Sequence, residues 1–278
     1  MAVHRLVVAC PDRSGIVAAV AGALAGIGAN IVHADQHTDR TREPEFFMRV
    51  EFEGVAPEVA DAAMDPLRRD FAMTVRTIDG ETVPELAIFV SKEDHCLREL
   101  LHECRNGDLR ARVGAVVGNH RELEEVCVPY GVPFHHVPVL PGDREAAERR
   151  QIEICRGVDA VVLAKYMQIV SPGFLSAFGG RVLNIHHSFL PAFVGANPYR
   201  QAHDRGVKLI GATAHYVTEV LDAGPIVEQD VARVDHRMDP RELRRIGRQV
   251  ERAVLARAVR WHVEDRVIRS GDRTVVFA

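Results

Sequence analysis

Polar side chains that could do chemistry gather where one apolar run ends, in the string N-I-H-H-S-F-L-P over residues 184–191. Asn184 and His186 are two residues apart, so on an extended strand their side chains project to the same side. An amide and an imidazole aimed at one oxygen are suited to stabilising an oxyanion. The pattern therefore makes Asn184 and His186 candidates for catalysis, with His187 beside them.

Two other interpretations of this cluster stay open on the residues alone. A polar patch at a strand end can cap the turn that follows it. The histidines could also gather around zinc, but no H-E-x-x-H or carboxylate-histidine spacing supports a metal site, and we expect none. The histidines concerned are His186, His187, His203 and His215.

A second polar cluster follows the apolar run GATAHYV, in a loop that holds Thr218, Glu219 and Asp222. The string D-A-G-P that begins at Asp222 is typical of a turn, so this carboxylate could bond the backbone of its own turn. If the loop lies beside His186, the same carboxylate would instead hold and polarise the imidazole, or position a water molecule.

The elements that must position these residues follow Pro84, where short apolar runs alternate with helical stretches. The runs are LAIFV, ARVGAVVG, FHHVPV, DAVVLAK and RVLNIHH. Strands of this kind predict an α/β fold with a mostly parallel, Rossmann-like sheet covered by helices on both faces, and such sheets bind ligands at the carboxyl ends of their strands. A long helix is expected after Asp239-Pro240, followed by two short strands around a Gly-Asp turn.

Residues 1–83 follow a different pattern, β-α-β-β-α-β, which is typical of ferredoxin-like domains. Ser14 or Asp12 could cap the first helix, and a second helix is expected over residues 57–70. The stretch D-G-E-T-V-P-E near residues 80–85 indicates a linker, so we place one domain at 1–83 and another at 84–278. The apolar stripe of the first helix consists of Ile16, Val20, Leu24 and Ile27.

Composition narrows the classes of function. The net charge of -4 provides no attraction to nucleic acid or anionic membranes, and no apolar run reaches membrane-spanning length. Five scattered cysteines without a C-x-x-C pair favour buried or incidental thiols in a reducing compartment, and a nucleophilic cysteine would need a nearby base. We therefore expect a soluble, cytosolic protein.

The strings N-I-H-x-S-x-L-P and T-x-H-x-V-x-x-x-x-D-x-G-P together resemble the 10-formyltetrahydrofolate-using formyltransferases, over residues 84–278. The motif NIHHSFLPAFVGA resembles the corresponding motif of the formyltetrahydrofolate deformylases, and it has His187 where the transferases usually carry Pro. The resemblance implies that Asn184, His186 and Asp222 are catalytic and that main-chain groups of two loops hold the folate. The corresponding loop residues are Lys165, Tyr166, Met167, Gln168, Thr218 and Glu219.

The reaction implied by the resemblance is hydrolysis of 10-formyltetrahydrofolate to tetrahydrofolate and formate, with no permanently bound cofactor. It would feed formate to purine synthesis and balance the one-carbon pool. Asn184 would donate to the oxyanion, His186 would stabilise it and pass a proton to N10, and Asp222 would orient His186 and accept the proton of water.

Water is the expected acceptor, because the stretch F-V-S-K-E-D-H over residues 89–95 has no glycine for a phosphate cradle and carries two adjacent acids. The alternative is formyl transfer to a small amine or a sugar nucleotide. His187 should point away from its strand neighbour His186, so it is either structural or shapes the acceptor side.

The string CPDRSGIVAAVAGALAGIGANI resembles an ACT domain, the ferredoxin-like amino-acid sensor. This implies glycine and methionine as effectors and a homodimer or homotetramer. The alternative for this domain is a purely structural dimerisation module. The alternative for the whole chain is a regulatory protein that binds folate without catalysis, which the presence of Asn184, His186 and Asp222 disfavours. The candidate effector residues are Asp12, Arg13, Ser14, Gly15 and Asn30.

Overall fold

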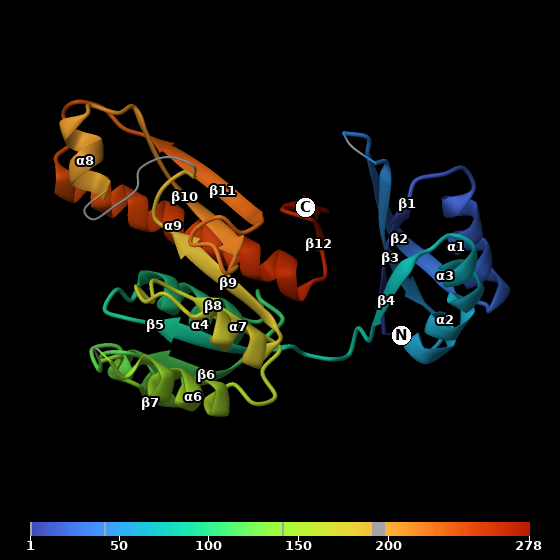
Figure 1. The fold of residues 1–278 in the computed structure, drawn as a ribbon, viewed down its shortest axis with the longest axis horizontal. Coiled ribbons are helices and arrows are strands. Elements are labelled where there is room, and N and C mark those ends of the chain that lie inside the picture. Colours follow the sequence, from blue (N-terminus) through green and yellow to red (C-terminus); the bar gives the residue numbers. More distant parts are fainter. Residues whose placement is uncertain (1, 42, 141, 191–197) are drawn as a thin grey trace. The chain divides into compact units, whose positions relative to one another are not determined.

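The computed structural model of the chain describes residues 2–41, 43–140, 142–190 and 198–278, and Figure 1 shows its elements. It divides into two compact units. The first comprises Met1–Val83, Asp265–Ser270 and Val275–Ala278, and the second comprises Pro84–Glu264 and Gly271–Thr274.

The first unit has the predicted ferredoxin-like order of elements. Its antiparallel sheet has the order β2-β3-β1-β4, and α1 buries Ile16, Val20 and Leu24 as the sequence pattern predicts. The elements are β1 (His4–Pro11), α1 (Ile16–Gly26), β2 (Asn30–Asp39), β3 (Glu45–Glu53), α2 (Pro57–Ala63), α3 (Asp65–Asp70) and β4 (Thr74–Ile78).

Two helix boundaries in this unit differ from the sequence-based predictions. Gly15, and not Ser14 or Asp12, occupies the position before α1, with φ at 93° and no side-chain cap. Glycine enters this left-handed conformation at little cost, so it can turn the chain into the helix where the other two residues would be strained. The single helix expected over 57–70 is two helices, since Pro66 begins a new first turn in α3.

The carboxyl-terminal strands also differ from the expected boundary, which placed everything after residue 84 in one domain. Asp265–Ser270 and Val275–Ala278 group with the first unit. Asp265 pairs with Arg5 at 3.2 Å and with Arg76 at 2.8 Å, so charges as well as apolar contacts attach this segment. The apolar contacts join Ile268 and Phe277 to Val7 and Phe47.

The second unit contains the predicted mostly parallel sheet, in the order β11-β10-β9-β8-β5-β6-β7. Strands β5 to β9 are parallel, and β10 and β11 are antiparallel. The strands are β5 (Glu85–Val90), β6 (Arg112–Gly118), β7 (Phe134–His136), β8 (Ala160–Leu163), β9 (Arg181–His186), β10 (Leu209–Tyr216) and β11 (Ile226–Arg233). The helical segments are α4 (His95–Asn106), α5 (Glu124–Cys127), η1 (Val128–Tyr130), α6 (Arg144–Ile154), α7 (Pro172–Phe178), α8 (Pro198–Asp204) and α9 (Pro240–Val263).

Helix α9 begins as the sequence predicts, with Pro240 in its first turn and Asp239 as its cap. The Asp239 carboxylate accepts from the amides of Arg241 and Glu242, and the Glu242 carboxylate accepts from the Asp239 amide. The hairpin of β12 (Val267–Ser270) and β13 (Arg273–Val276) follows. No helix within the described ranges combines the length and apolar character that crossing a membrane requires.

Candidate active site

The candidate catalytic residues lie at the carboxyl end of β9, next to the point where the sheet changes from parallel to antiparallel. Asn184 and His186 are on β9, and the antiparallel register places Asn184 directly opposite His215 of β10. The loop after β10 returns Asp222 to the same place. The sheet thus brings together Asn184, His186 and Asp222, which the sequence analysis grouped.

His186 has one occupied and one open ring nitrogen. Its Nδ1 lies 3.3 Å from Oδ2 of Asp222. Its Nε2 is buried and has no hydrogen-bond partner within the described ranges. Because an imidazole held at Nδ1 presents Nε2 in a fixed direction, the open nitrogen is available to a bound molecule.

His215, which the sequence analysis considered only among possible zinc ligands, is a further member of the site. The ring is 2% exposed, and its Nδ1 donates to the carbonyl of Tyr216 at 3.0 Å. Its Nε2 lies between Nδ2 of Asn184, at 3.2 Å, and Oδ1 of Asp222, at 3.6 Å. His215 therefore links the other side chains, and the T-x-H-x-V spacing was the signal that could have identified it.

The Asp222 carboxylate bonds imidazoles, which decides against the turn interpretation of its side chain. Hydrogen bonds from His186 and then His215 hold the pKa of Asp222 well below its usual range, against the opposing effect of burial. Its backbone is left-handed, with φ at 53°. Such a conformation in a non-glycine residue is uncommon and is typical of functional sites.

His187 does not point away from His186 as strand alternation predicts. The two rings stack, with centroids 5.1 Å apart and planes at 18°. The reason is that β9 ends at His186, so the alternation of an extended strand no longer applies to the next residue. Burial, followed by the charges of Lys165 and His186, lowers the pKa of His187 from 6.5 to about 4.

Hydrogen bonds from β10 and β11 fix the chain just after the two histidines. Thr213 donates to the Ser188 carbonyl at 2.9 Å and accepts from the Leu190 amide at 3.1 Å. Gln229 donates to the Leu190 carbonyl at 3.1 Å. The remainder of the N-I-H-H-S-F-L-P-A-F-V-G-A motif, residues 191–196, lies outside the described residues.

A cavity of about 60 Å³ adjoins Asn184 and Asp222. Exposed apolar side chains surround it, among them Ile169, Val220 and Leu221. Of the residues expected to hold folate, Gln168, Thr218 and Glu219 line this cavity.

The other three expected folate residues do not line this cavity: the side chains of Tyr166 and Lys165 bond other groups, and that of Met167 is exposed. Tyr166 is 2% exposed, and its hydroxyl accepts from Gln151 at 2.7 Å. Lys165 is 6% exposed, with Nζ 3.2 Å from Glu251. Met167 is 64% exposed. The backbone at Lys165 and Met167 is left-handed, with φ at 63° and 55°, so this loop is conformationally strained like the turn at Asp222.

Comparison with known proteins agrees with this site and fold. A formyl transferase model matches residues 85–259, and an ACT domain model matches residues 4–65. A formyltetrahydrofolate deformylase from Bacillus subtilis is 48% identical over 98% of this chain and 93% of that relative, and one from Mycobacterium tuberculosis is 51% identical over 99% and 91%. The crystal structure of a formyltetrahydrofolate deformylase from Pseudomonas syringae has a TM-score of 0.96 at 45% identity, covering 100% of this chain and 95% of that one.

The chain belongs to the formyltetrahydrofolate deformylase family. This membership confirms the resemblance found in the sequence and the combination of an ACT domain with a formyltransferase domain.

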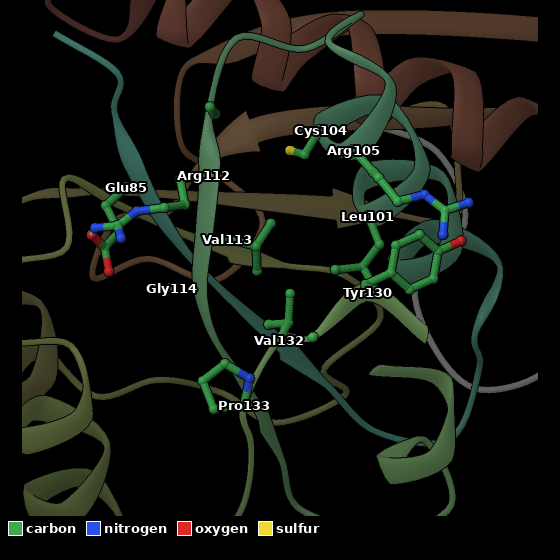
Figure 2. Close-up of a pocket in the computed structure, with 12 residues that line it drawn as sticks. Glu85, Leu101, Cys104, Arg105, Arg112, Val113, Gly114, Tyr130, Val132 and Pro133 are labelled. Carbon is green, nitrogen blue, oxygen red and sulfur yellow. Dashed lines mark hydrogen bonds and ion pairs between the residues drawn. The ribbon is translucent and has the colours of Figure 1, made fainter. Parts of the chain in front are cut away.

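A larger hollow in this deformylase-family chain, of about 460 Å³, is lined by residues at the amino-terminal ends of β5 and β6, and Figure 2 shows how these residues lie. Glu85 and Arg112, which pair with each other, begin the parallel strands β5 and β6, whereas Asn184 and His186 end β9. Arg105 stacks on the Tyr130 ring with its guanidinium 4.6 Å from the ring centre. Strand direction therefore separates this hollow from the candidate active site.

The candidate effector residues are not all brought together within one chain. Arg13, Ser14 and Gly15 are exposed after the end of β1, and the Arg13 guanidinium lies 3.9 Å from the Phe71 ring centre. Asp12 precedes them and is half-buried.

Asn30 lies at the other end of the same sheet. On strand β3, Glu45 pairs with Pro11 and Glu53 pairs with Asn30, so these points are eight positions apart along the strand. At the rise of an antiparallel strand this is roughly 27 Å. Asn30 donates to Glu53 at 3.2 Å.

The side chains that could hold a metal differ from the histidines considered in the sequence. Within the described ranges, the one group with ligand atoms inside 4.8 Å of one another is His95, Cys96 and Glu251. Lys165 and His95 already contact Glu251, at 3.2 Å and 2.7 Å, so protein groups already neutralise the carboxylate. Burial raises the pKa of Cys96, so its thiol is not poised as a ligand or nucleophile.

Proposed function

We propose that this chain hydrolyses 10-formyltetrahydrofolate to tetrahydrofolate and formate. The observation that carries the proposal is the grouping of Asn184, His186 and Asp222 beside a small cavity with apolar surroundings, in a chain whose relatives over nearly its full length are formyltetrahydrofolate deformylases. The geometry suits addition of water to a formyl carbon, with stabilisation of the oxyanion that develops.

The oxyanion would be stabilised by two donors. One N–H of the Asn184 amide and the open Nε2 of His186 would supply them, from side chains two residues apart at the end of β9. With Nδ1–H directed at the Asp222 carboxylate, Nε2 donates when the imidazole carries its second proton. Preorganised donors of this kind lose little on reorganising as the charge forms.

The His186 and Asp222 pair would handle the proton. As the oxygen of water bonds to the formyl carbon, the proton of water passes to the Asp222 carboxylate. As the carbon–N10 bond breaks, N10 receives a proton from His186, and the proton held by Asp222 then restores His186. Hydrogen bonds from His186 and His215 hold the pKa of Asp222 low, so the carboxylate is ionised at neutral pH, orients the imidazole and is free of a proton when water attacks.

The folate ring would enter the cavity beside Asn184 and Asp222. At about 60 Å³ the cavity is smaller than the roughly 300–1,000 Å³ of typical ligand pockets. Binding therefore requires the exposed side chains of Val220 and Leu221 to move and then cover the ligand. Main-chain groups of residues 165–168 and 218–222 would supply the polar contacts.

The residues that follow β5, where the phosphate of an acceptor would bind, favour water over a phosphorylated amine as the acceptor. Ser91 to His95 follow β5, and this stretch presents Glu93 and Asp94 where a phosphate would need N–H donors. No observation favours the alternative of transfer to a small amine or sugar nucleotide.

The test is to mix the purified chain with 10-formyltetrahydrofolate and no other acceptor, and to measure tetrahydrofolate and formate together. Equal amounts of both, formed over many turnovers, are the expected result. Turnover that begins only when an amine is added would contradict hydrolysis and support a transferase.

Regulation and assembly form the finer part of the proposal. Glycine and methionine would act through Asp12 to Gly15, in a cytosolic homodimer or homotetramer that supplies formate to purine synthesis. Calorimetry should use the full chain, because Ile268 and Phe277 from its end belong to the first unit. Lack of heat with either amino acid would contradict the effector proposal.

A further inference from the structure

One face of β10 carries three residues that contact the site, at alternate positions of the strand. Gly211, Thr213 and His215 are two residues apart, so they project to the same side of the sheet. His215 bonds Asn184. The other two lie beside residues 187–190, which follow β9 and are called here the post-β9 segment.

The backbone of the post-β9 segment is bonded by side chains. Within the described ranges, no backbone–backbone hydrogen bond outside the helices and strands involves residues 187–190. Instead, Oγ1 of Thr213 donates to the Ser188 carbonyl at 2.9 Å and accepts from the Leu190 amide at 3.1 Å. Nε2 of Gln229 donates to the Leu190 carbonyl at 3.1 Å. Because backbone groups withdrawn from water need partners, these two side chains determine where the segment lies.

The hydroxyl of Thr213 is buried and fully used. Thr213 is 0% exposed in a strand of mostly apolar residues, where a hydroxyl without hydrogen bonds would be unfavourable. Besides its bonds to Ser188 and Leu190, Oγ1 accepts from Nε2 of Gln229 at 2.9 Å. A hydroxyl has one donor position and two acceptor positions, and all of them are occupied. The burial of this polar group is thus explained by its bonds to the post-β9 segment and to Gln229.

The strand register places this hydroxyl next to His186. Thr213 is the direct partner of His186 on β9 and of Gln229 on β11, and directly opposite residues of antiparallel strands project to the same face. Two residues before Thr213, a Cβ placed on Gly211 would stand 3.2 Å from Cβ of Phe189. The glycine therefore lets the post-β9 segment lie close against β10.

The post-β9 segment begins with His187, whose ring stacks on that of His186 with centroids 5.1 Å apart. Asp222 holds His186 at Nδ1, and Nε2 is open. A ring that is bonded at one nitrogen alone can still tilt, and a second ring stacked on it limits this tilt. The position of the segment therefore affects the direction of the open Nε2.

We propose that Thr213 is a positioning residue for the hydrolysis, because its hydroxyl holds the post-β9 segment and thereby keeps His187 stacked on His186. Gln229 supports Thr213 in this role. The inference rests on the proposed function, in which His186 donates to the oxyanion and to N10. Neither Thr213 nor Gln229 is among the described residues that line the cavity beside Asn184, so the role concerns the chemical step and not folate binding.

The first test compares Thr213→Val, which keeps the shape of the side chain and removes the hydroxyl, with Thr213→Ser, which keeps the hydroxyl. Because small displacements of catalytic groups can lower rates by about 100-fold, we expect Thr213→Val to lower kcat by roughly 10- to 100-fold, with KM for 10-formyltetrahydrofolate nearly unchanged. Thr213→Ser should recover most of this loss. Thr77→Val serves as control, since it removes a hydroxyl that bonds Asp61 in the first unit and should leave turnover unaltered.

Gln229→Met tests the supporting bonds. It removes the donor to the Leu190 carbonyl and to Thr213, while Thr213 still bonds two backbone groups of the segment. The loss in kcat should therefore be smaller than in Thr213→Val. In the double variant the two losses should not multiply, because residues that share one hydrogen-bond network are coupled.

The second measurement follows the rings of His186 and His187 by NMR of histidine-labelled protein, with the single His→Gln variants for assignment. Stacked rings shift each other's signals, so Thr213→Val should move the signals of both rings, and Thr213→Ser should leave them near their original positions. The exposed His102 of α4 serves as internal reference. A merely structural role for Thr213 would change stability and leave these signals and the kcat of the folded chain unaltered.

An unchanged kcat in folded Thr213→Val overturns the inference. So does a loss of kcat that Thr213→Ser shares in full, or one that leaves both histidine signals unmoved. If Thr213→Val does not fold, Gln229→Met decides by the same criteria. Failure of the proposed function is recognised separately, since the unmodified chain would then release no formate without an amine. If the unmodified chain hydrolyses and Thr213→Val does so at the same rate, only the present inference fails.

Discussion

Two carboxylates of the second unit, Asp222 and Glu251, have similar partners and different surroundings. Each bonds a histidine and has a lowered pKa. The Asp222 side chain is 29% exposed and holds His186, whose Nε2 is open, while that of Glu251 is 1% exposed and has donors on both oxygens. We call the Asp222 group open, because its carboxylate is partly exposed, and the Glu251 group closed, because both oxygens of its carboxylate are buried and bonded. One histidine nitrogen in each group, Nε2 of His186 and Nδ1 of His95, has no hydrogen-bond partner among the described residues, so the exposure of the carboxylate is what distinguishes the groups.

The largest expected effect on stability comes from breaking the closed group. Glu251→Leu leaves Lys165 and His95 buried without their counter-charge and should destabilise the second unit by about 3–5 kcal/mol. Trp261 is the single tryptophan and lies on the same helix, so its fluorescence during urea unfolding reports this change. The exposed Glu122→Leu serves as control and should stay within about 0.5 kcal/mol. A Glu251→Leu chain as stable as the unmodified one would refute the closed network.

The open group should respond in activity more than in stability. Asn184→Ala removes an oxyanion donor and should lower kcat by about 100- to 1000-fold. Asn106→Ala is the matched control, because Asn106 also pairs with a histidine, His102 at 3.0 Å, but on the exposed end of α4. Near-normal turnover by folded Asn184→Ala would remove Asn184 from the mechanism.

Acid should weaken the closed group in a defined window of pH. The pKa of Glu251 is lowered from 4.5 to about 2, so its contribution to stability is fully present above pH 4.5 and is lost as the pH falls toward 2. The loss should be roughly 3 kcal/mol and should be absent from Glu251→Gln. Urea titrations between pH 6 and about 2.5, followed at Trp261, measure the difference. Parallel pH curves for the two chains would contradict the lowered pKa.

The cap at the start of α9 should contribute less to the free energy of unfolding than the buried Glu251 network, and so provides a reference for it. Asp239→Ala removes the helix cap and should cost about 1 kcal/mol, measured by the same fluorescence. This change should leave turnover unaltered. A cost equal to that of Glu251→Leu would mean that the buried network contributes no more than an exposed cap.

The sheet and one face of the site could be predicted from the sequence because they depend on local patterns. Apolar runs identified β5 to β9, and the two-residue spacing of Asn184 and His186 placed them on one side of a strand. The partnership of Asp222 with His186 came from the family resemblance, since its turn signal alone favoured a backbone role. His187 was misplaced because no local pattern shows that β9 ends one residue earlier.

The Glu251 network was missed because its members are far apart in the chain, with 156 residues between His95 and Glu251. A signal was nevertheless present. Glu251 falls on the buried face of α9, in the four-residue repeat of Leu243, Gly247 and Leu255, where a charge is unexpected. Lys165 is one of only three lysines and directly follows an apolar strand.

The central claim is that water receives the formyl group. It is tested most directly by one round of turnover in ¹⁸O-labelled water without any amine, followed by mass analysis of the formate after rapid quenching. The account predicts that the formate carries one labelled oxygen and appears together with an equal amount of tetrahydrofolate. Unlabelled formate, or no formate until an amine is supplied, would contradict it.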